Sequence, residues 1–201
     1  MGKWLLLAVS CYLIGGIPFG FITARLLGVD ITKYGSGATG ATNVMRVVGP
    51  VPAVISGVLD LSKGIMSVLI GRALFGPGNL LPPLVAGMFA MTGHNFSPYL
   101  RFRGGKGVAV GAGVAATLMP KVALAGFLVF LFVVVLTRYV SLGSMVCAVS
   151  TVAAALVYHE PPLYTGFLVL ASAYIVFQHR SNIRRLVAGK ESKFGERVKV
   201  K

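Results

Sequence analysis

Acidic residues and cysteines are scarce in this chain. The 201 residues contain five Asp and Glu against nineteen Lys and Arg, which leaves a formal net charge of +14. The two cysteines, Cys11 and Cys147, lie inside apolar segments, so we expect small buried hydrophobes and no disulfide framework. Charged residues make up only 12% of the chain, and the mean hydropathy is +0.82. These values exclude an ordinary soluble domain and indicate a polytopic membrane protein.

The placement of the cations and two missing sequence features narrow the possible classes of protein. The cations fall at the ends of apolar runs rather than along one face, which argues against a nucleic-acid-binding protein despite the net charge. The first apolar run, Trp4–Thr23, has no small-residue cleavage site after it, so we expect it to remain as the first span. No internal repeat is visible, so the inverted repeats of many transporters are missing.

The apolar runs predict an all-α fold with seven transmembrane helices. Several runs are shorter than the ~20 residues that an upright span needs, and the shortest flank the loop 101–107. That loop is therefore expected to dip below the headgroups, protected by neighbouring helices. The runs are Trp4–Thr23, Val51–Gly71, Leu80–Gly93, Val108–Met119, Val122–Thr137, Val140–Tyr158 and Leu163–Gln178.

The distribution of cations over the loops predicts the orientation. Seven spans place fifteen Lys and Arg on one side of the membrane and three on the other. The positive-inside rule then puts the first side in the cytoplasm, with the N-terminus outside and the C-terminus inside. The fifteen are Arg25, Lys33, Arg46, Arg101, Arg103, Lys106, Arg138, Arg180, Arg184, Arg185, Lys190, Lys193, Arg197, Lys199 and Lys201.

The stretch Arg101–Gly107 combines three cations with three glycines between two apolar runs. Glycines let backbone N–H groups approach a ligand closely, and Lys106 adds a point charge, so the stretch predicts a phosphate site. It is not a Walker A loop, because Gly107 stands where Ser or Thr would hold Mg²⁺. The alternative is a loop whose cations only set the membrane topology.

The stretch Gly35–Arg46 is a second candidate for oxyanion binding. It carries three glycines, three hydroxyl side chains, the amide of Asn43 and the cation of Arg46 within twelve residues. We expect Thr42 and Asn43 to cap a helix with Arg46 one turn further on, a geometry suited to oxyanions. A plain linker would also be rich in Gly and Thr, but it would not need Asn43 and Arg46.

Two sets of ionisable residues lie within or at the ends of the predicted spans. Asp60 and Lys63 are three apart on one helical face at membrane depth. We expect a mutual pair, or a pair with a loop Arg, that fixes helix packing rather than catalysis. His94 is expected to cap or hydrogen-bond at a helix end, although it has the chemistry of a base.

The last polar stretch, His179–Leu186, follows the final predicted span. His179 and Asn182 share a face if the last helix continues. Attraction to lipid headgroups explains Arg184 and Arg185, but it does not explain a His, a Ser and an Asn at the membrane boundary.

These stretches resemble the bacterial acyl-phosphate:glycerol-3-phosphate acyltransferases, a polytopic membrane family, over nearly the whole chain. Gly35–Arg46 matches the family's G-S-G-N-x-G-A-T-N-x-x-R, except that Ala38 replaces Asn. Gly93–Gly107 is similar to G-H-x-F…F-K-G-G-K-G, with Arg103 for Lys. His179–Leu186 with Gly189 and Glu191 resembles H-R-x-N-I-x-R-L…G-x-E, and the element Asp60-x-x-Lys63-Gly64 also recurs in the family.

The resemblance implies one integral-membrane acyltransferase domain over residues 1–201, in the bacterial inner membrane, with its active site on the cytoplasmic face. It implies transfer of a long-chain acyl group from acyl phosphate to the 1-hydroxyl of glycerol 3-phosphate, giving lysophosphatidic acid and phosphate. Acyl phosphate is a mixed anhydride and already activated, so no covalent enzyme intermediate is needed. Membrane lipid is the remaining partner. No cofactor, metal ion, nucleic acid or obligatory protein partner is implied.

The resemblance also assigns roles to residues. Lys106, Arg46 and loop amides would hold charge on the phosphates and the oxyanion, and Ser36, His179 and Asn182 would orient the acceptor. The remaining phosphate-binding positions are Gly37, Ala41, Thr42, Asn43, Arg103, Gly104, Gly105 and Gly107. The supporting positions are Asp60, Lys63, His94 and Glu191.

Alternatives remain at this stage. The H-x-x-x-x-D pair of other glycerolipid acyltransferases is absent, because Tyr99, Tyr164 and Arg184 occupy the Asp position after the three histidines. A transporter or channel for phosphorylated metabolites would place its cations along the spans rather than on one face. A non-catalytic protein that binds anionic lipid would explain the basic tail but not the two glycine-rich loops.

Overall fold

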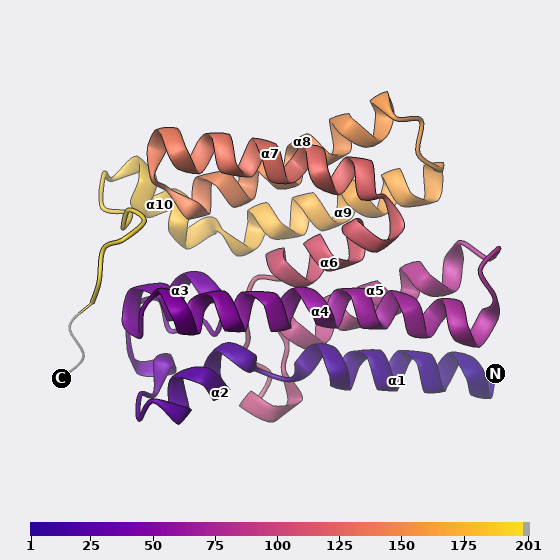
Figure 1. Cartoon of the computed structure of the whole chain (residues 1–201), viewed down its shortest axis with the longest axis horizontal. Coiled ribbons are helices and arrows are strands. Elements are labelled where there is room, and N and C mark those ends of the chain that lie inside the picture. The colour runs from indigo at the N-terminus through magenta and orange to yellow at the C-terminus, as the bar shows by residue number, and fades with distance from the viewer. Residues whose placement is uncertain (199–201) are drawn as a thin grey trace. The chain divides into compact units, whose positions relative to one another are not determined.

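The computed structural model describes residues 1–198, and helices account for all regular structure in that range (Figure 1). Lys199 and Lys201, which the orientation argument counted, lie outside the described residues. The helices are α1 (Gly2–Gly16), α2 (Phe19–Leu26), α3 (Ala41–Val47), α4 (Pro50–Phe75), α5 (Leu81–Asn95), α6 (Val108–Leu118), α7 (Pro120–Thr137), α8 (Val140–Val157), α9 (Pro162–Gln178) and α10 (Arg180–Val187), with short 3-10 turns η1 (Ile31–Lys33) and η2 (Pro98–Leu100).

The chain forms two compact units. The first comprises Met1–Leu118 together with the tail from Arg197, and the second comprises Met119–Glu196. The glycine-rich stretches at 35–46 and 104–107 belong to the first unit, and the stretch at 179–191 belongs to the second. Each unit therefore holds part of the predicted site residues.

Glycines allow the helices of the first unit to pack closely. α4 packs against α5 and α6, and α1 packs against α5 and α4. An added Cβ at Gly64 would overlap the carbonyl oxygen of Val110 across the α4–α6 contact, and one at Gly93 would overlap that of Tyr12 across the α1–α5 contact. Small residues at such contacts are the usual means of helix association in a membrane.

The first apolar run is broken in the middle. α1 ends at Gly16 and α2 begins at Phe19, with Ile17 in an extended conformation (φ −56°, ψ 116°). The residue before a proline is disfavoured in the helical region, and Pro18 has no N–H to donate, so the break falls where the sequence has Ile17-Pro18. The carbonyls at the end of α1 consequently lack helical partners.

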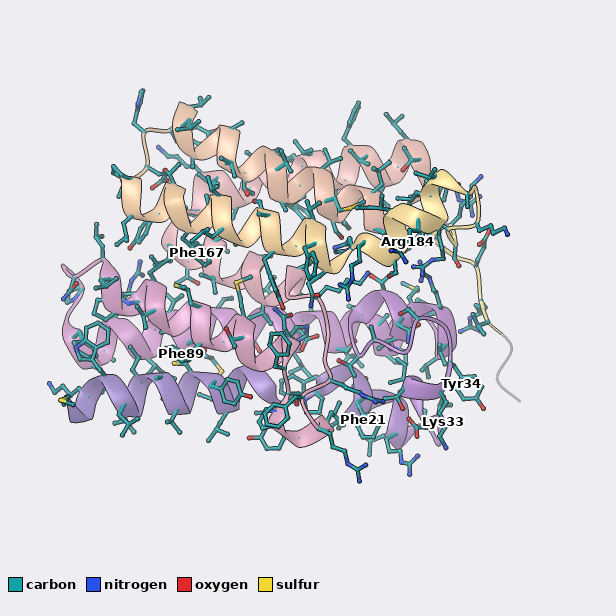
Figure 2. All side chains as sticks on the ribbon, turned by 180° about the vertical axis from the view of Figure 1, so that it is seen from behind. Phe21, Lys33, Tyr34, Phe89, Phe167 and Arg184 are labelled. Carbon is teal, nitrogen blue, oxygen red and sulfur yellow. The ribbon has the colours of Figure 1, made fainter. Side chains whose placement is uncertain are left out.

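Four segments are long and apolar enough to cross a membrane: Gly2–Leu26, Pro50–Phe75, Pro120–Thr137 and Val140–Val157. Val108–Leu118 and Pro162–Gln178 are shorter apolar helices. The count of seven spans stays a prediction. Large apolar side chains stand out from the helices along their length (Figure 2), and Phe132 and Leu136 of α7 are each about two-thirds exposed. Such surfaces suit lipid as the surrounding solvent.

The second unit is built on α7, α8 and α9, with α8 packed against both neighbours. α9 ends at Gln178 and α10 begins at Arg180, so His179 lies at the junction of the two helices. Cys11 is buried, Cys147 is half-buried and both are free thiols.

Candidate active site

Asn43 organises the loop that precedes α3. Its Oδ1 accepts a hydrogen bond from the Ser36 backbone N–H at 3.0 Å, and its Nδ2 donates to the carbonyls of Ala38 at 2.9 Å and Tyr34 at 3.1 Å. The expectation that Thr42 and Asn43 cap the helix is wrong. α3 begins at Ala41 with Gly40 before it and no side-chain cap, because the Asn43 amide turns back into the loop instead.

The other predicted residues of this loop differ in backbone conformation and in exposure to solvent. Gly35 and Gly37 have positive φ angles of 62° and 70°, which glycine adopts without strain, and Ser36 between them is exposed. Arg46 is buried near the end of α3, with 8% of its surface exposed. Ala38, which departs from the family pattern, takes part through its backbone, since its carbonyl accepts from Asn43.

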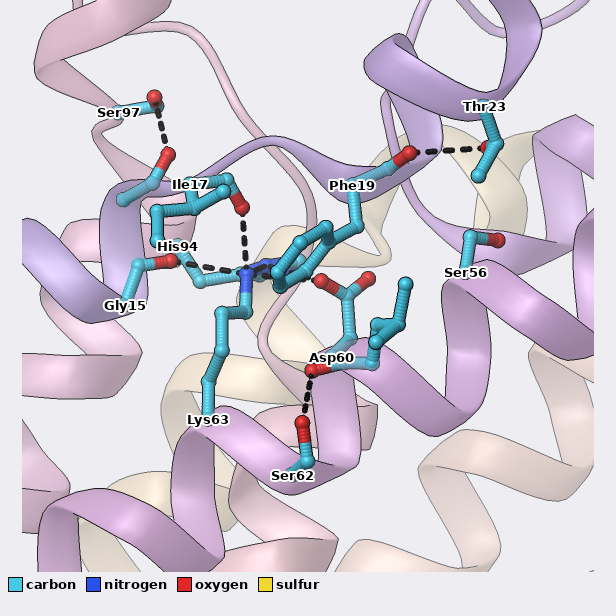
Figure 3. Close-up of polar contacts among 12 residues, drawn as sticks. Gly15, Ile17, Phe19, Thr23, Ser56, Asp60, Ser62, Lys63, His94 and Ser97 are labelled. Carbon is cyan, nitrogen blue, oxygen red and sulfur yellow. Dashed lines mark hydrogen bonds and ion pairs between the residues drawn. The ribbon is translucent and has the colours of Figure 1, made fainter.

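A buried polar cluster joins α4, α5 and the break after α1 (Figure 3). The Lys63 ammonium lies 2.7 Å from Asp60 Oδ1 and donates to the carbonyls of Gly15 and Ile17, each at 2.9 Å. It also lies 3.2 Å from His94 Nδ1. Asp60 and Lys63 are each 1% exposed. The predicted ion pair is confirmed, and its ammonium also donates to two carbonyls at the break.

The glycine loop packs directly on the C-terminal end of α5. The Gly105 N–H donates to the His94 carbonyl at 3.1 Å. An added Cβ would meet the carbonyls of His94 and Asn95 at Gly104, the His94 ring at Gly105 and the Asn95 amide at Gly107, where φ is 82°. The Cβ directions at these glycines thus face the protein. The sequence pattern predicts that these glycines allow close approach by a ligand, and helix packing is a second reason for them.

The cations of this loop have different settings. Arg101 and Arg103 are exposed, Lys106 is half-buried, and Arg101 has a positive φ of 52°. Ser97, which no sequence pattern singles out, anchors the start of the loop: its Oγ donates to the Gly16 carbonyl at 2.5 Å. Serine is common in loops, so only the structure distinguishes this one.

In the second unit, Glu191 gathers the polar groups of the last stretch. Its Oε1 accepts from Asn182 Nδ2 at 2.7 Å and from Ser141 Oγ at 2.9 Å, and its Oε2 accepts from Arg185 Nε at 2.6 Å. Burial acts to raise the pKa of the Glu191 carboxyl, but the hydrogen bonds and the charge of Arg185 outweigh burial and hold the pKa below its usual value. Ser141 is a partner that sequence reasoning missed.

His179 is fixed by a hydrogen bond to its own helix. Its Nδ1 lies 2.8 Å from the Ile175 carbonyl oxygen, and the side chain is buried. Since a carbonyl can only accept, Nδ1 carries the proton, and Nε2 of the neutral ring is left as an acceptor. His179 and Asn182 are both buried in the second unit. The last apolar helix ends at Gln178, so the continuous helix on which their common face was expected to depend is not present.

Taken unit by unit, the arrangement suits anionic ligands. The first unit combines two tight glycine loops with the cations Arg46 and Lys106, and the second holds an oriented imidazole and amide. Among residues 1–198, no group of three or more His, Cys, Asp or Glu side chains has the arrangement of a metal site. The cations, loop amides and oriented side chains of the two units offer charge stabilisation and hydrogen bonding.

Known proteins share the sequence and the fold. The family model described as glycerol-3-phosphate acyltransferase matches residues 5–189. Glycerol-3-phosphate acyltransferase 2 of Moorella thermoacetica is 43% identical, with 96% of this chain and 99% of that protein covered. Glycerol-3-phosphate acyltransferase 1 of Deinococcus radiodurans is 44% identical, with 96% and 97% covered.

Two solved structures give the same result. The crystal structure of PlsY, an integral membrane glycerol 3-phosphate acyltransferase, in its glycerol 3-phosphate form has a TM-score of 0.90 and 38% identity, with 96% of each chain covered. Its lysophosphatidic acid form has a TM-score of 0.87, with 96% of this chain and 95% of that chain covered. The resemblance seen in the sequence motifs is confirmed: this chain belongs to the glycerol-3-phosphate acyltransferase family of integral membrane enzymes typified by PlsY.

Proposed function

We propose that this enzyme transfers a long-chain acyl group from acyl phosphate to the 1-hydroxyl of glycerol 3-phosphate. The products are lysophosphatidic acid and inorganic phosphate, the first acylation of phospholipid synthesis. The similar PlsY structures in their glycerol 3-phosphate and lysophosphatidic acid forms support the acceptor and the product. Residues 1–201 would act as one acyltransferase domain, without a cofactor or an obligatory protein partner.

The observation that carries the proposal is the glycine loop with Lys106, held on the end of α5 by the Gly105–His94 hydrogen bond. Both proposed substrates carry a phosphate, and a loop of backbone N–H groups with a cation is suited to a phosphate. In this proposal Lys106 and Arg46 hold charge on the phosphates and on the oxyanion that forms during acyl transfer. The positions around them that the family motif assigns to phosphate binding are Gly37, Ala41, Thr42, Asn43, Arg103, Gly104, Gly105 and Gly107.

The reaction needs only one displacement. The acceptor hydroxyl oxygen attacks the acyl carbonyl carbon, and the bond from that carbon to the phosphate oxygen then breaks. The hydroxyl proton leaves with phosphate as hydrogen phosphate. Because the donor is a mixed anhydride with a good leaving group, no acyl-enzyme is required.

The proton has two candidate acceptors. His179 Nε2 is an acceptor because Nδ1 donates to the Ile175 carbonyl. A phosphate oxygen of the donor, however, lies beside the reacting carbonyl by covalent necessity. We favour the donor phosphate as the base, with His179, Asn182 and Ser36 holding the acceptor hydroxyls by hydrogen bonds.

The membrane setting follows from the cation distribution. We propose a multi-pass protein of the bacterial inner membrane with seven spans, the N-terminus outside and the active site on the cytoplasmic face. Fifteen Lys and Arg on one side against three on the other support this orientation. Glycerol 3-phosphate would then arrive from the cytoplasm and the acyl chain from the lipid.

The test is a donor panel with purified protein and labelled glycerol 3-phosphate. Acyl phosphate, acyl-CoA and the acylated form of acyl carrier protein are each supplied as donor. Labelled lysophosphatidate and inorganic phosphate are measured. The proposal expects product from acyl phosphate, with one phosphate released per lysophosphatidate. Turnover with acyl-CoA or acyl-carrier protein but not with acyl phosphate would overturn the donor assignment.

A further inference from the structure

We infer that His94, held by Lys63 of the ion pair with Asp60, is the positioning residue of the glycine loop. Position 105 must then be glycine, because a Cβ there would overlap the His94 ring. The inference rests on the proposed function, since it says how the proposed phosphate-binding loop is kept in place. It assigns no proton transfer to His94.

One side of the His94 ring is tied to the ion pair. An ammonium has three protons, and two of those of Lys63 point to the carbonyls of Gly15 and Ile17. The third points to His94 Nδ1 at 3.2 Å, and Asp60 Oδ1 lies 2.7 Å from the ammonium as its counter-charge. A proton on Nδ1 would point at this cation, and the 3.6 Å from Nδ1 to Asp60 Oδ1 is too long for a hydrogen bond.

The tautomer follows from that arrangement. Nδ1 is an acceptor toward Lys63, so the ring is neutral and Nε2 carries the proton. Nε2 is the ring atom nearest to the position that a Cβ at Gly105 would occupy, with Cε1 at 2.8 Å and Cδ2 at 3.0 Å. The Nε2 edge of the ring, away from the contact with Lys63, thus packs against Gly105.

The backbone contact reinforces the ring contact. The His94 carbonyl accepts from the Gly105 N–H at 3.1 Å, so one residue of α5 holds Gly105 through both its ring and its backbone. Lys63 in turn is fixed by the carbonyls of Gly15 and Ile17 and by the Phe19 ring, whose centroid is 5.4 Å away. Charges at membrane depth persist where they serve such a purpose, because removing one partner leaves the other uncompensated.

The experiment is a double-mutant cycle with Gly105→Ala, His94→Ala and the double variant. In the wild-type background the new methyl overlaps the ring, the loop is displaced, and the KM for glycerol 3-phosphate is expected to rise about tenfold or more with a smaller change in kcat. In the His94→Ala background the ring is gone, and the same change is expected to raise the KM by no more than about twofold. If Gly105→Ala raised the KM by the same factor in both backgrounds, the inference would be overturned.

His94→Asn separates positioning from acid–base chemistry. Its amide oxygen can accept from Lys63 in place of Nδ1, so the fold is retained, but no ring supports Gly105. The expected result is a raised KM with a wild-type pH profile. A large fall in kcat at unchanged KM, with loss of one limb of the pH profile, would make His94 catalytic and overturn the inference. Gly111→Ala is the matched control, since its Cβ would meet only the flexible end of Met91.

Thermal unfolding of the same variants in detergent repeats the cycle without substrate. Gly105→Ala is expected to lower the midpoint in the wild-type background and to leave it unchanged in the His94→Ala background. A wild-type protein that makes no lysophosphatidate would contradict the proposed function, while the midpoints would still decide the steric coupling. Equal shifts in both backgrounds would overturn the inference whatever the activity.

Discussion

Replacing Glu191 by Gln removes the one charge that gathers the polar groups around Asn182. The carboxylate accepts from Asn182 at 2.7 Å and from Arg185 at 2.6 Å. A Gln side chain keeps one oxygen acceptor but turns an NH₂ group toward one of these donors. The variant therefore loses at least one charge-assisted hydrogen bond, which contributes about 1.5–3 kcal/mol.

That free energy bounds the effect on the acceptor. If all of it orients Asn182 toward glycerol 3-phosphate, the KM rises by about ten- to hundredfold, because each 1.36 kcal/mol is about a factor of ten. The assay is steady-state acyl transfer with glycerol 3-phosphate varied at saturating acyl phosphate. Glu196→Gln is the matched control, because Glu196 is exposed and, within residues 1–198, its carboxylate accepts only from the Lys193 backbone N–H.

The lowered pKa of Glu191 predicts the direction in which folding stability changes with pH. Because the pKa of Glu191 is lowered in the folded protein, its contribution to stability is present above the unfolded-state pKa and is lost as the pH falls through the folded-state value. Wild-type stability should therefore decline in acid, below the usual range of a glutamate, and the Gln variant should lack this part of the decline. An unchanged KM in folded Glu191→Gln, or effects that multiply with those of Asn182→Ala, would refute the coupling.

Three further outcomes are expected. Lys106→Ala should lower kcat/KM at least tenfold, because a charge-assisted phosphate contact contributes about 1.5–3 kcal/mol; normal activity would leave the loop as a topology signal only. Gly64→Ala should destabilise the fold by about 1–3 kcal/mol, measured by thermal unfolding, because its Cβ overlaps the Val110 carbonyl. In a background without native cysteines, a cysteine at Gly78 should react with impermeant thiol reagent on intact cells and one at Lys193 should not; the reverse pattern would invert the orientation.

Patterns that repeat along the chain made the fold class predictable. Apolar runs and their punctuation by Pro and Gly locate most helices, and the spacing of Asp60 and Lys63 predicted their ion pair, which is observed at 2.7 Å. The break at Ile17-Pro18 was not anticipated, since a proline near the middle of an apolar run is tolerated in many membrane helices. What satisfies the broken end is Lys63, distant in sequence, and no local pattern reveals that contact.

The site was predictable in its residues but not in its connections. Motif spacing identified Asn43, His94 and Glu191, yet the assignment of Asn43 as a cap was wrong because its amide has better partners in the loop. Ser97 and Ser141 were not predicted, and one physical reason explains both. A serine acquires a role from the group that it faces across the fold, which depends on tertiary packing and not on its neighbours in the chain.

The scarcity of acids acquires a physical meaning in the structure. An enzyme whose proposed substrates are both phosphates gains from cations and is harmed by an unneutralised carboxylate near its loops, because like charges repel strongly where water is excluded. Asp60 and Glu191 are the acids buried within residues 1–198, and each is neutralised, by Lys63 and by Arg185. Glu191 can thus orient hydrogen-bond donors, and neither carboxylate adds a net negative charge. Each buried carboxylate is thus tolerated as half of an ion pair. The Asp60–Lys63 pair contacts His94 and the Glu191–Arg185 pair contacts Asn182, so each pair fixes a residue of a predicted substrate-binding stretch.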